Sequence, residues 1–93
     1  MTEQTTISFV VRGPIARPDL PGLCDRLHDR IAEHHAVCVV CDISGLAADA
    51  ITVDALARLR LTACRCGCAL SVEGWSEELR NLIAFVGLRD VLL

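Results

Sequence analysis

The stretch from Val37 to Gly67 constrains the fold of this chain more than any other. It opens with Val37–Cys41, a continuous apolar run in which β-branched valines predominate. Such runs are typical of a strand that is covered on both faces. Asp42 ends the run, and Ser44 with Gly45 favours a turn. We therefore predict a buried strand that leads into a short acidic loop.

A helix is predicted to follow that loop, from Val53 to Cys66. Thr52 is the expected N-cap, since its hydroxyl can accept from an unpaired amide of the next turn. Gly67 is the expected residue just past the helix end. Asp54 would then lie in the first turn. A strand, a loop and a helix N-terminus together form a corner suited to recognition, and this corner contains an acid.

The size and composition predict a single domain covering residues 1–93, because a chain of 93 residues can build only one modest core. Hydrophobic residues make up 53% of the chain, yet no apolar run approaches the roughly 20 residues that span a bilayer. The polar start, Met1–Thr6, lacks the pattern of a signal peptide. We therefore expect a cytoplasmic protein without membrane association. Its apolar surplus belongs in a core or on a surface that another protein covers.

The charge and the reactive residues argue against two functional classes. A formal net charge of -3 disfavours nucleic acid as a partner, because phosphate binding needs a basic patch. The sequence shows no nucleophile–base pair and no glycine-rich phosphate loop. All three histidines belong to the first predicted helix or its end. We expect a protein that is not an enzyme and needs no cofactor.

Six cysteines raise a second possibility, a small protein that binds metal or senses thiol chemistry. The pair Cys38 and Cys41 has metal-like spacing, but residues three apart on a strand point to opposite faces. The Cys64-x-Cys66-x-Cys68 series lacks the two-residue gap of common zinc sites. Because cysteine buries well as a small hydrophobe, we expect all six to be reduced and free of metal: Cys24, Cys38, Cys41, Cys64, Cys66 and Cys68.

The rest of the chain alternates between strand and helix patterns. The predicted elements, in order, are a strand at 5–12, a helix at 18–33, the central strand and helix, a strand at 69–72, a helix capped by Ser76 and ended by Gly87, and a last short strand at 91–93. This alternation predicts an α/β fold with a mostly parallel sheet and helices packed on it. Strand-to-helix loops of such folds gather at one edge, where binding usually occurs.

The central helix is apolar over more than half of its circumference. One arc, formed by Leu56, Leu59, Ala63 and Cys66, is extended by a second, formed by Val53, Ala57, Leu61 and Cys64. A narrow polar stripe holds Asp54, Arg58, Thr62 and Arg65. Two possibilities stay open: other helices of this domain cover the second arc, or a partner docks on it.

From roughly Phe9 to Leu92 the chain resembles a STAS domain, the fold of bacterial anti-sigma factor antagonists. The central strand ends in an Asp-aliphatic-Ser-Gly pattern, a helix follows, and Gly-Leu-x-x-Val comes near the end. The segments that carry the resemblance are 11–15, 39–46, 52–59, 65–68, 78–79 and 87–91. Members of this family typically bind a kinase-type anti-sigma factor and are switched off by phosphorylation of one serine.

The resemblance implies a partner of that kind and a place for the phosphorylated residue. The family pattern Asp-Ser-Ser-Gly-Leu opens the central helix and is matched here by Thr52–Leu56, which puts Asp54 at the phosphoacceptor position. The preceding loop, residues 47–51, is longer than usual. The residues expected to contact the partner are Ser44, Asp49, Thr52, Asp54, Ala55, Arg58 and Leu61.

Compared with the family pattern, we also expect a trimmed domain, without the additional first strand and the fuller C-terminal strand and helix that are common in the family. Sheet edges left open in this way tend to pair with other chains, so we expect a homodimer or a tight hetero-complex. The resulting prediction is a protein-interaction module that binds an anti-sigma factor or a related regulatory protein and has no phosphoserine switch.

Overall fold

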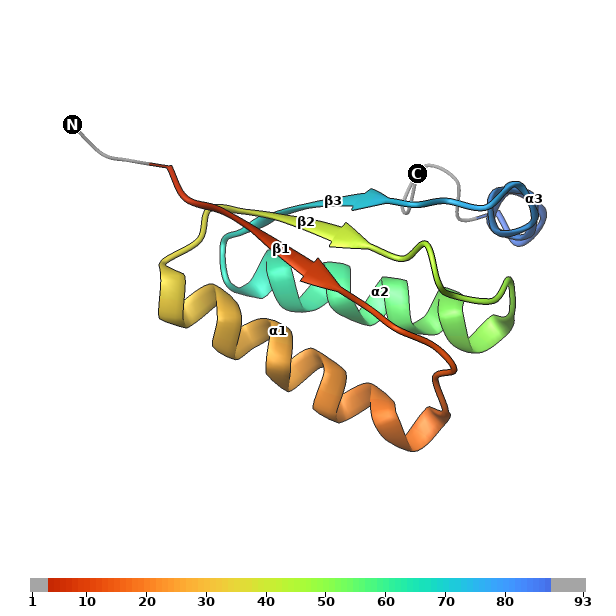
Figure 1. Cartoon of the computed structure of the whole chain (residues 1–93), viewed down its shortest axis with the longest axis horizontal. Coiled ribbons are helices and arrows are strands. Elements are labelled where there is room, and N and C mark those ends of the chain that lie inside the picture. The colour runs from red at the N-terminus through yellow and green to blue at the C-terminus, as the bar shows by residue number, and fades with distance from the viewer. Residues whose placement is uncertain (1–3, 88–93) are drawn as a thin grey trace.

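The computed structural model describes residues 4–87 and shows an α/β fold (Figure 1). This confirms the predicted class and the alternation of strands and helices. The elements, in chain order, are β1 (Thr6–Val10), the short 3-10 helix η1 (Arg17–Asp19), α1 (Leu20–His34), β2 (Cys38–Asp42), α2 (Ala50–Arg65), β3 (Ala69–Glu73) and α3 (Glu77–Phe85). The predicted strand at 91–93 lies outside the described residues.

The sheet has the strand order β1-β2-β3, and both neighbouring pairs are parallel. The register aligns Thr6 with Cys38 and Cys38 with Ala69. Helices α1 and α2 lie side by side on one face of this sheet (Figure 1). Each helix connects two neighbouring parallel strands by a right-handed crossover, and the strands follow one another in chain order across the sheet. Both helices therefore lie on the same side of the sheet.

Within residues 4–87, helices therefore cover only one face of the central strand (Figure 1), and the prediction of cover on both faces is wrong for this part of the chain. Val39 and Cys41 point toward the helices and are completely buried, with 0% exposure. Cys38 and Val40 belong to the opposite face and are only half-buried. Their apolar character reflects a face of the sheet that no helix within residues 4–87 covers.

The core lies between the sheet and the two long helices. Helix α1 contributes the predicted stripe, with Leu20, Leu23, Leu27 and Ile31 buried. Leu59 of α2 is as fully buried as Leu27. Fully burying one such side chain is worth about 1.5–3 kcal/mol, so the facing apolar sides of the two helices hold the layers together.

Helix α3 closes one end of the molecule. It lies beyond the carboxyl end of β3, near the start of α2, rather than alongside the other helices (Figure 1). Ser76 is its N-cap, as predicted, and its side chain accepts a hydrogen bond from the Leu79 amide at 3.0 Å. Leu79 and Ile83 are buried in the common core.

Within residues 4–87, no helix combines the length and the apolar character needed to cross a membrane.

Candidate partner-binding surface

The start of α2 differs from the prediction. The helix begins at Ala50, and Asp49 is its N-cap, accepting a hydrogen bond from the Thr52 amide at 2.8 Å. The prediction that Thr52 caps a helix starting at Val53 is wrong. An Asp caps at least as well as a Thr, and the Thr52 side chain is needed inside, where the residue is only 2% exposed. The expected loop at 47–51 is correspondingly shorter, because its last two residues are helical.

Asp54 is consequently the fifth residue of α2, and the first turn contains no acid. Its carboxylate instead forms two ion pairs. Arg58 Nε donates to Oδ1 at 2.9 Å, and Arg17 Nη1 donates to Oδ2 at 3.5 Å. The hydrogen bond and the charge of Asp54 raise the pKa of Arg58 further above its usual value. The negative charge of Asp54 is therefore balanced by side chains and not by the end of the helix.

The structure separates the predicted contact residues into buried and accessible ones. Thr52 and Ala55, at 2% and 1% exposure, belong to the core and offer a partner no surface. The expectation that these two residues contact a partner is therefore not supported by their position. The accessible residues of the predicted set are Ser44, Asp49, Arg58 and Leu61, together with the partly exposed Asp54.

Helix α2 carries an apolar stripe formed by Val53, Ala57, Leu61 and Cys64, of which Val53 is half-buried against the core and the other three are exposed within residues 4–87. Its buried side holds Ala55, Leu56, Leu59 and Ala63, which face the core. Leu61 is 49% exposed, and Ala57 and Cys64 are also exposed. Among residues 4–87, neighbouring elements thus cover one apolar arc, and they cover the other only in part, at Val53. Asp54 and Arg58 lie on the adjacent face of the helix and give the stripe a charged border.

Ser44 occupies a tight turn at the end of β2. Its amide and its hydroxyl both donate to Asp42 Oδ1, at 3.0 and 2.6 Å. These two hydrogen bonds lower the pKa of the Asp42 carboxyl. A side chain at Gly74 would place its Cβ 2.7 Å from the Ser44 amide nitrogen, so the turn after β3 packs closely against this loop. The Ser44 hydroxyl is exposed, but it is already committed as a donor to a carboxylate.

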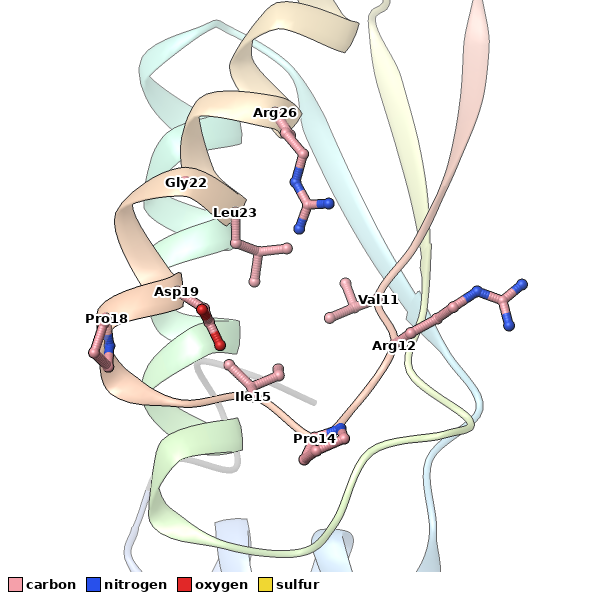
Figure 2. A pocket seen from close by; sticks show the side chains of 9 residues that line it. All are labelled: Val11, Arg12, Pro14, Ile15, Pro18, Asp19, Gly22, Leu23 and Arg26. Atoms are coloured by element: carbon pink, nitrogen blue, oxygen red, sulfur yellow. The ribbon is translucent and has the colours of Figure 1, made fainter.

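A hollow of about 470 Å³ lies between the end of β1 and the start of α1 (Figure 2). Val11, Ile15 and Leu23 give it an apolar floor, Arg26 extends along its rim, and Arg12 points away from it (Figure 2). None of the predicted contact residues lines it. The sequence offered no signal for this hollow, because its walls come together only when β1 and α1 pack. It holds no group of converging polar side chains that would define a reaction.

All six cysteines are free thiols. Burial, with a smaller contribution from the neighbouring Asp42, raises the pKa of Cys41 to about 11. Burial likewise raises the pKa of Cys68. In residues 4–87 no three potential metal-ligating side chains come together. A thiolate is the reactive form, so the two buried thiols are poorly suited to redox chemistry near neutral pH.

The sequence predicted only part of the candidate partner-binding surface. The helical period of α2 predicted the apolar stripe and the line of Asp54 and Arg58. Arg17 was missed, because its partner Asp54 is 37 residues away along the chain. The role of Asp42 in the Ser44 turn was also missed, although an Asp two residues before a Ser is a recognisable turn signal.

Comparison of the chain with protein-family models and with curated proteins finds no match. The class of protein is therefore inferred from the fold and from the surface of α2.

Proposed function

We propose that this protein is a non-enzymatic, cytoplasmic protein-interaction module that acts in the manner of an anti-sigma factor antagonist. Its partner would be an anti-sigma factor or a related regulatory protein, and it would need no cofactor. The observation that carries the proposal is the exposed part of the apolar stripe of α2, Ala57, Leu61 and Cys64, beside the Asp54–Arg58 ion pair.

The stripe has the character of a binding surface because its members are aligned. Single exposed apolar residues are ordinary, but aligned ones on one helix provide a continuous surface that excludes water on contact. Interfaces commonly combine an apolar centre with a polar rim, and Asp54 with Arg58 supplies such a rim. A partner that contributes an apolar surface and one complementary charge would fit here.

The same region argues for binding without a phosphorylation switch. In the register implied by the resemblance, Asp54 occupies the phosphoacceptor position, and a carboxylate has no hydroxyl to accept a phosphoryl group. The observed helix start also allows a second register, in which Asp49–Val53 matches the family pattern. Ala50 and Ile51 then occupy the positions of the two serines. Both registers leave the acceptor position without a hydroxyl group.

The two hydroxyl groups among the predicted contact residues, those of Thr52 and Ser44, are poorly placed to replace it. Thr52 is buried, and a phosphate on it would have to enter the core. A phosphate on Ser44 would lie beside the Asp42 carboxylate, which would repel it. These positions favour constitutive binding.

The test measures the affinity of the protein for its cognate anti-sigma factor by calorimetry, with the Leu61→Asp variant. Placing a charge in the centre of the stripe should weaken binding at least about tenfold while leaving the fold intact. Phe85→Asp is the matched control, because Phe85 is an 88% exposed apolar residue on α3 that is not part of the stripe. Equal affinities of wild type and Leu61→Asp would refute the proposal.

Incubation with the kinase-type partner and ATP, followed by mapping of phosphate by mass spectrometry, tests the missing switch separately. No phosphorylation that changes binding is expected. Phosphate on Thr52 or Ser44 that abolishes binding would show that the switch has moved to a new residue.

A further inference from the structure

Among residues 4–87, strand β1 is an edge of the sheet, with β2 as its neighbour on one side and no strand on the other. Alternate residues of a parallel strand direct both backbone groups to the same side. The hydrogen bonds from the Val37 amide to Thr5 O, at 3.0 Å, and from the Val11 amide to Asp42 O, at 2.9 Å, show that odd-numbered residues face β2. The amides and carbonyls of Thr6, Ser8 and Val10 therefore point away from β2. One of these groups, Ser8 O, accepts a hydrogen bond from Arg30 Nη2 at 3.3 Å.

Helix α1 places a row of alternating charges beside this edge. Arg26, Asp29, Arg30 and Glu33 share one face of the helix and are all exposed. Together with Ser8, Phe9 and Val10 they line a hollow of about 450 Å³. The charges along the row run positive, negative, positive, negative. A strand edge whose outward backbone groups include Ser8 O, the acceptor for Arg30, thus adjoins a helix face with an ordered charge pattern.

This charge pattern is complementary to itself under a two-fold rotation. An axis that passes between positions 29 and 30 brings Arg26 opposite Glu33 of the partner subunit. The same axis brings Asp29 opposite Arg30 of the partner subunit. Every positive charge of the row then faces a negative one, giving two kinds of ion pair, each formed twice.

Strand β1 has its own natural centre for such a rotation. Ser8 is the midpoint of the three residues whose backbone groups point outward. The hydrogen bond between Arg30 and Ser8 O places this midpoint beside the midpoint of the charge row. The centre defined by backbone geometry and the centre defined by charge therefore coincide.

We propose that a second copy of this chain docks on the β1 edge, with the two β1 strands antiparallel about a two-fold axis at Ser8. Ser8 would exchange backbone hydrogen bonds with Ser8 of the partner subunit, and Thr6 with Val10 of the partner subunit. Val10, which is 52% exposed, would pack against Thr6 of the partner subunit. The described strands of the two sheets, β1 to β3 of each copy, then form one continuous sheet, and the α1 helices lie antiparallel beside each other.

This assembly uses surfaces that the proposed function does not. It buries the β1 edge and α1, and leaves the apolar stripe of α2 free for a different partner. The inference therefore stands or falls independently of the proposed function. It also explains why an open sheet edge is tolerated: in the assembly, the edge is paired.

A charge-swap experiment tests the docking. Sedimentation equilibrium of the purified full chain should show a dimer. Arg26→Glu and Glu33→Arg each create two like-charge contacts and should weaken the dimer by about tenfold. The double variant restores opposite charges and should return the dissociation constant to within about threefold of wild type. Arg65→Glu, an exposed charge change on α2, is the control and should leave the constant unchanged.

Hydrogen exchange supplies a readout that does not depend on the variants. In the dimer, the amides of Thr6, Ser8 and Val10 should be protected, and dilution to the monomer should release them. The amides of Ile7 and Phe9 should stay protected in both states, because they face β2. A strictly monomeric wild type at high concentration would refute the proposal. So would a dimer with rapidly exchanging Thr6, Ser8 and Val10 amides, or a double swap that binds no better than either single variant.

Discussion

Helices α1 and α2 cover the same face of the sheet, but their outward sides have opposite chemistry. Each buries one apolar side, with Leu27 and Leu59 both at 0% exposure. The outward side of α1 beside the strand edge is a row of alternating charges, whereas that of α2 includes an apolar stripe with Leu61 at its centre. The sheet thus dictates only the inner sides of the helices. The outer sides are available for two different kinds of contact. The charge row of α1 can align a partner through ion pairs, and the stripe of α2 can bury apolar area.

The largest expected effect comes from comparing the two sides of α2 itself. Leu59→Ala should lower the free energy of unfolding by about 2–5 kcal/mol, because it leaves a cavity in the core. Leu61→Ala should change it by less than about 0.5 kcal/mol, since the side chain is half-exposed. Urea denaturation of both variants measures the difference. A loss above about 1.5 kcal/mol for Leu61→Ala would show that the stripe is covered within the protein.

The second effect concerns the start of α2, where the structure and the sequence-based prediction disagree. Asp49→Ala should cost about 0.5–2 kcal/mol, because it removes the side chain that accepts from the Thr52 amide. Thr52→Val keeps the buried shape and should cost less than Asp49→Ala. Urea denaturation measures both losses in the free energy of unfolding. A larger loss for Thr52→Val than for Asp49→Ala would indicate that Thr52 is the N-cap.

This disagreement shows what the sequence could and could not predict. Periodicity identified the elements and their order, because an apolar stripe that repeats every 3.6 residues is typical of a helix with one face on a core. It placed the start of α2 poorly because Asp49 and Thr52 are both good capping residues three positions apart. Choosing between them requires knowing that Thr52 points into the core, which is a tertiary fact.

Long-range features were equally inaccessible to sequence reasoning. The valine-rich run of β2 predicted cover on both faces, but the order of the strands put both helices on one face. Arg17 pairs with Asp54 only because η1 and α2 meet in the fold. For the candidate binding surface, periodicity predicted the stripe around Leu61. The position of the α1 charge row beside β1, where Arg30 donates to Ser8 O, depends on the tertiary fold and has no signal in the sequence.

A third prediction sharpens the contrast by removing the charged border of the α2 stripe. Asp54→Asn abolishes both ion pairs and should lower Tm by no more than about 4 °C, because exposed pairs contribute little. The difference in Tm between wild type and Asp54→Asn should become smaller at high salt, which screens these charges. Thermal melts at two salt concentrations measure this. A larger decrease in Tm that does not depend on salt would mean that Asp54 has a structural role besides its ion pairs with Arg17 and Arg58.

The smallest expected effect is a pH dependence at the turn leading into α2. The hydrogen bonds from Ser44 hold the pKa of Asp42 in the folded protein below its ordinary value of about 4. Their stabilising contribution is present above the unfolded-state pKa and is lost as the pH falls through the lower, folded-state pKa. Ser44→Ala removes the hydroxyl donor and should therefore destabilise the protein at neutral pH, with a difference from wild type that narrows as the pH drops below about 4. Chemical denaturation across that range measures the narrowing, and a difference that widened in acid would mean that the carboxyl group is not the partner that the Ser44 hydroxyl stabilises.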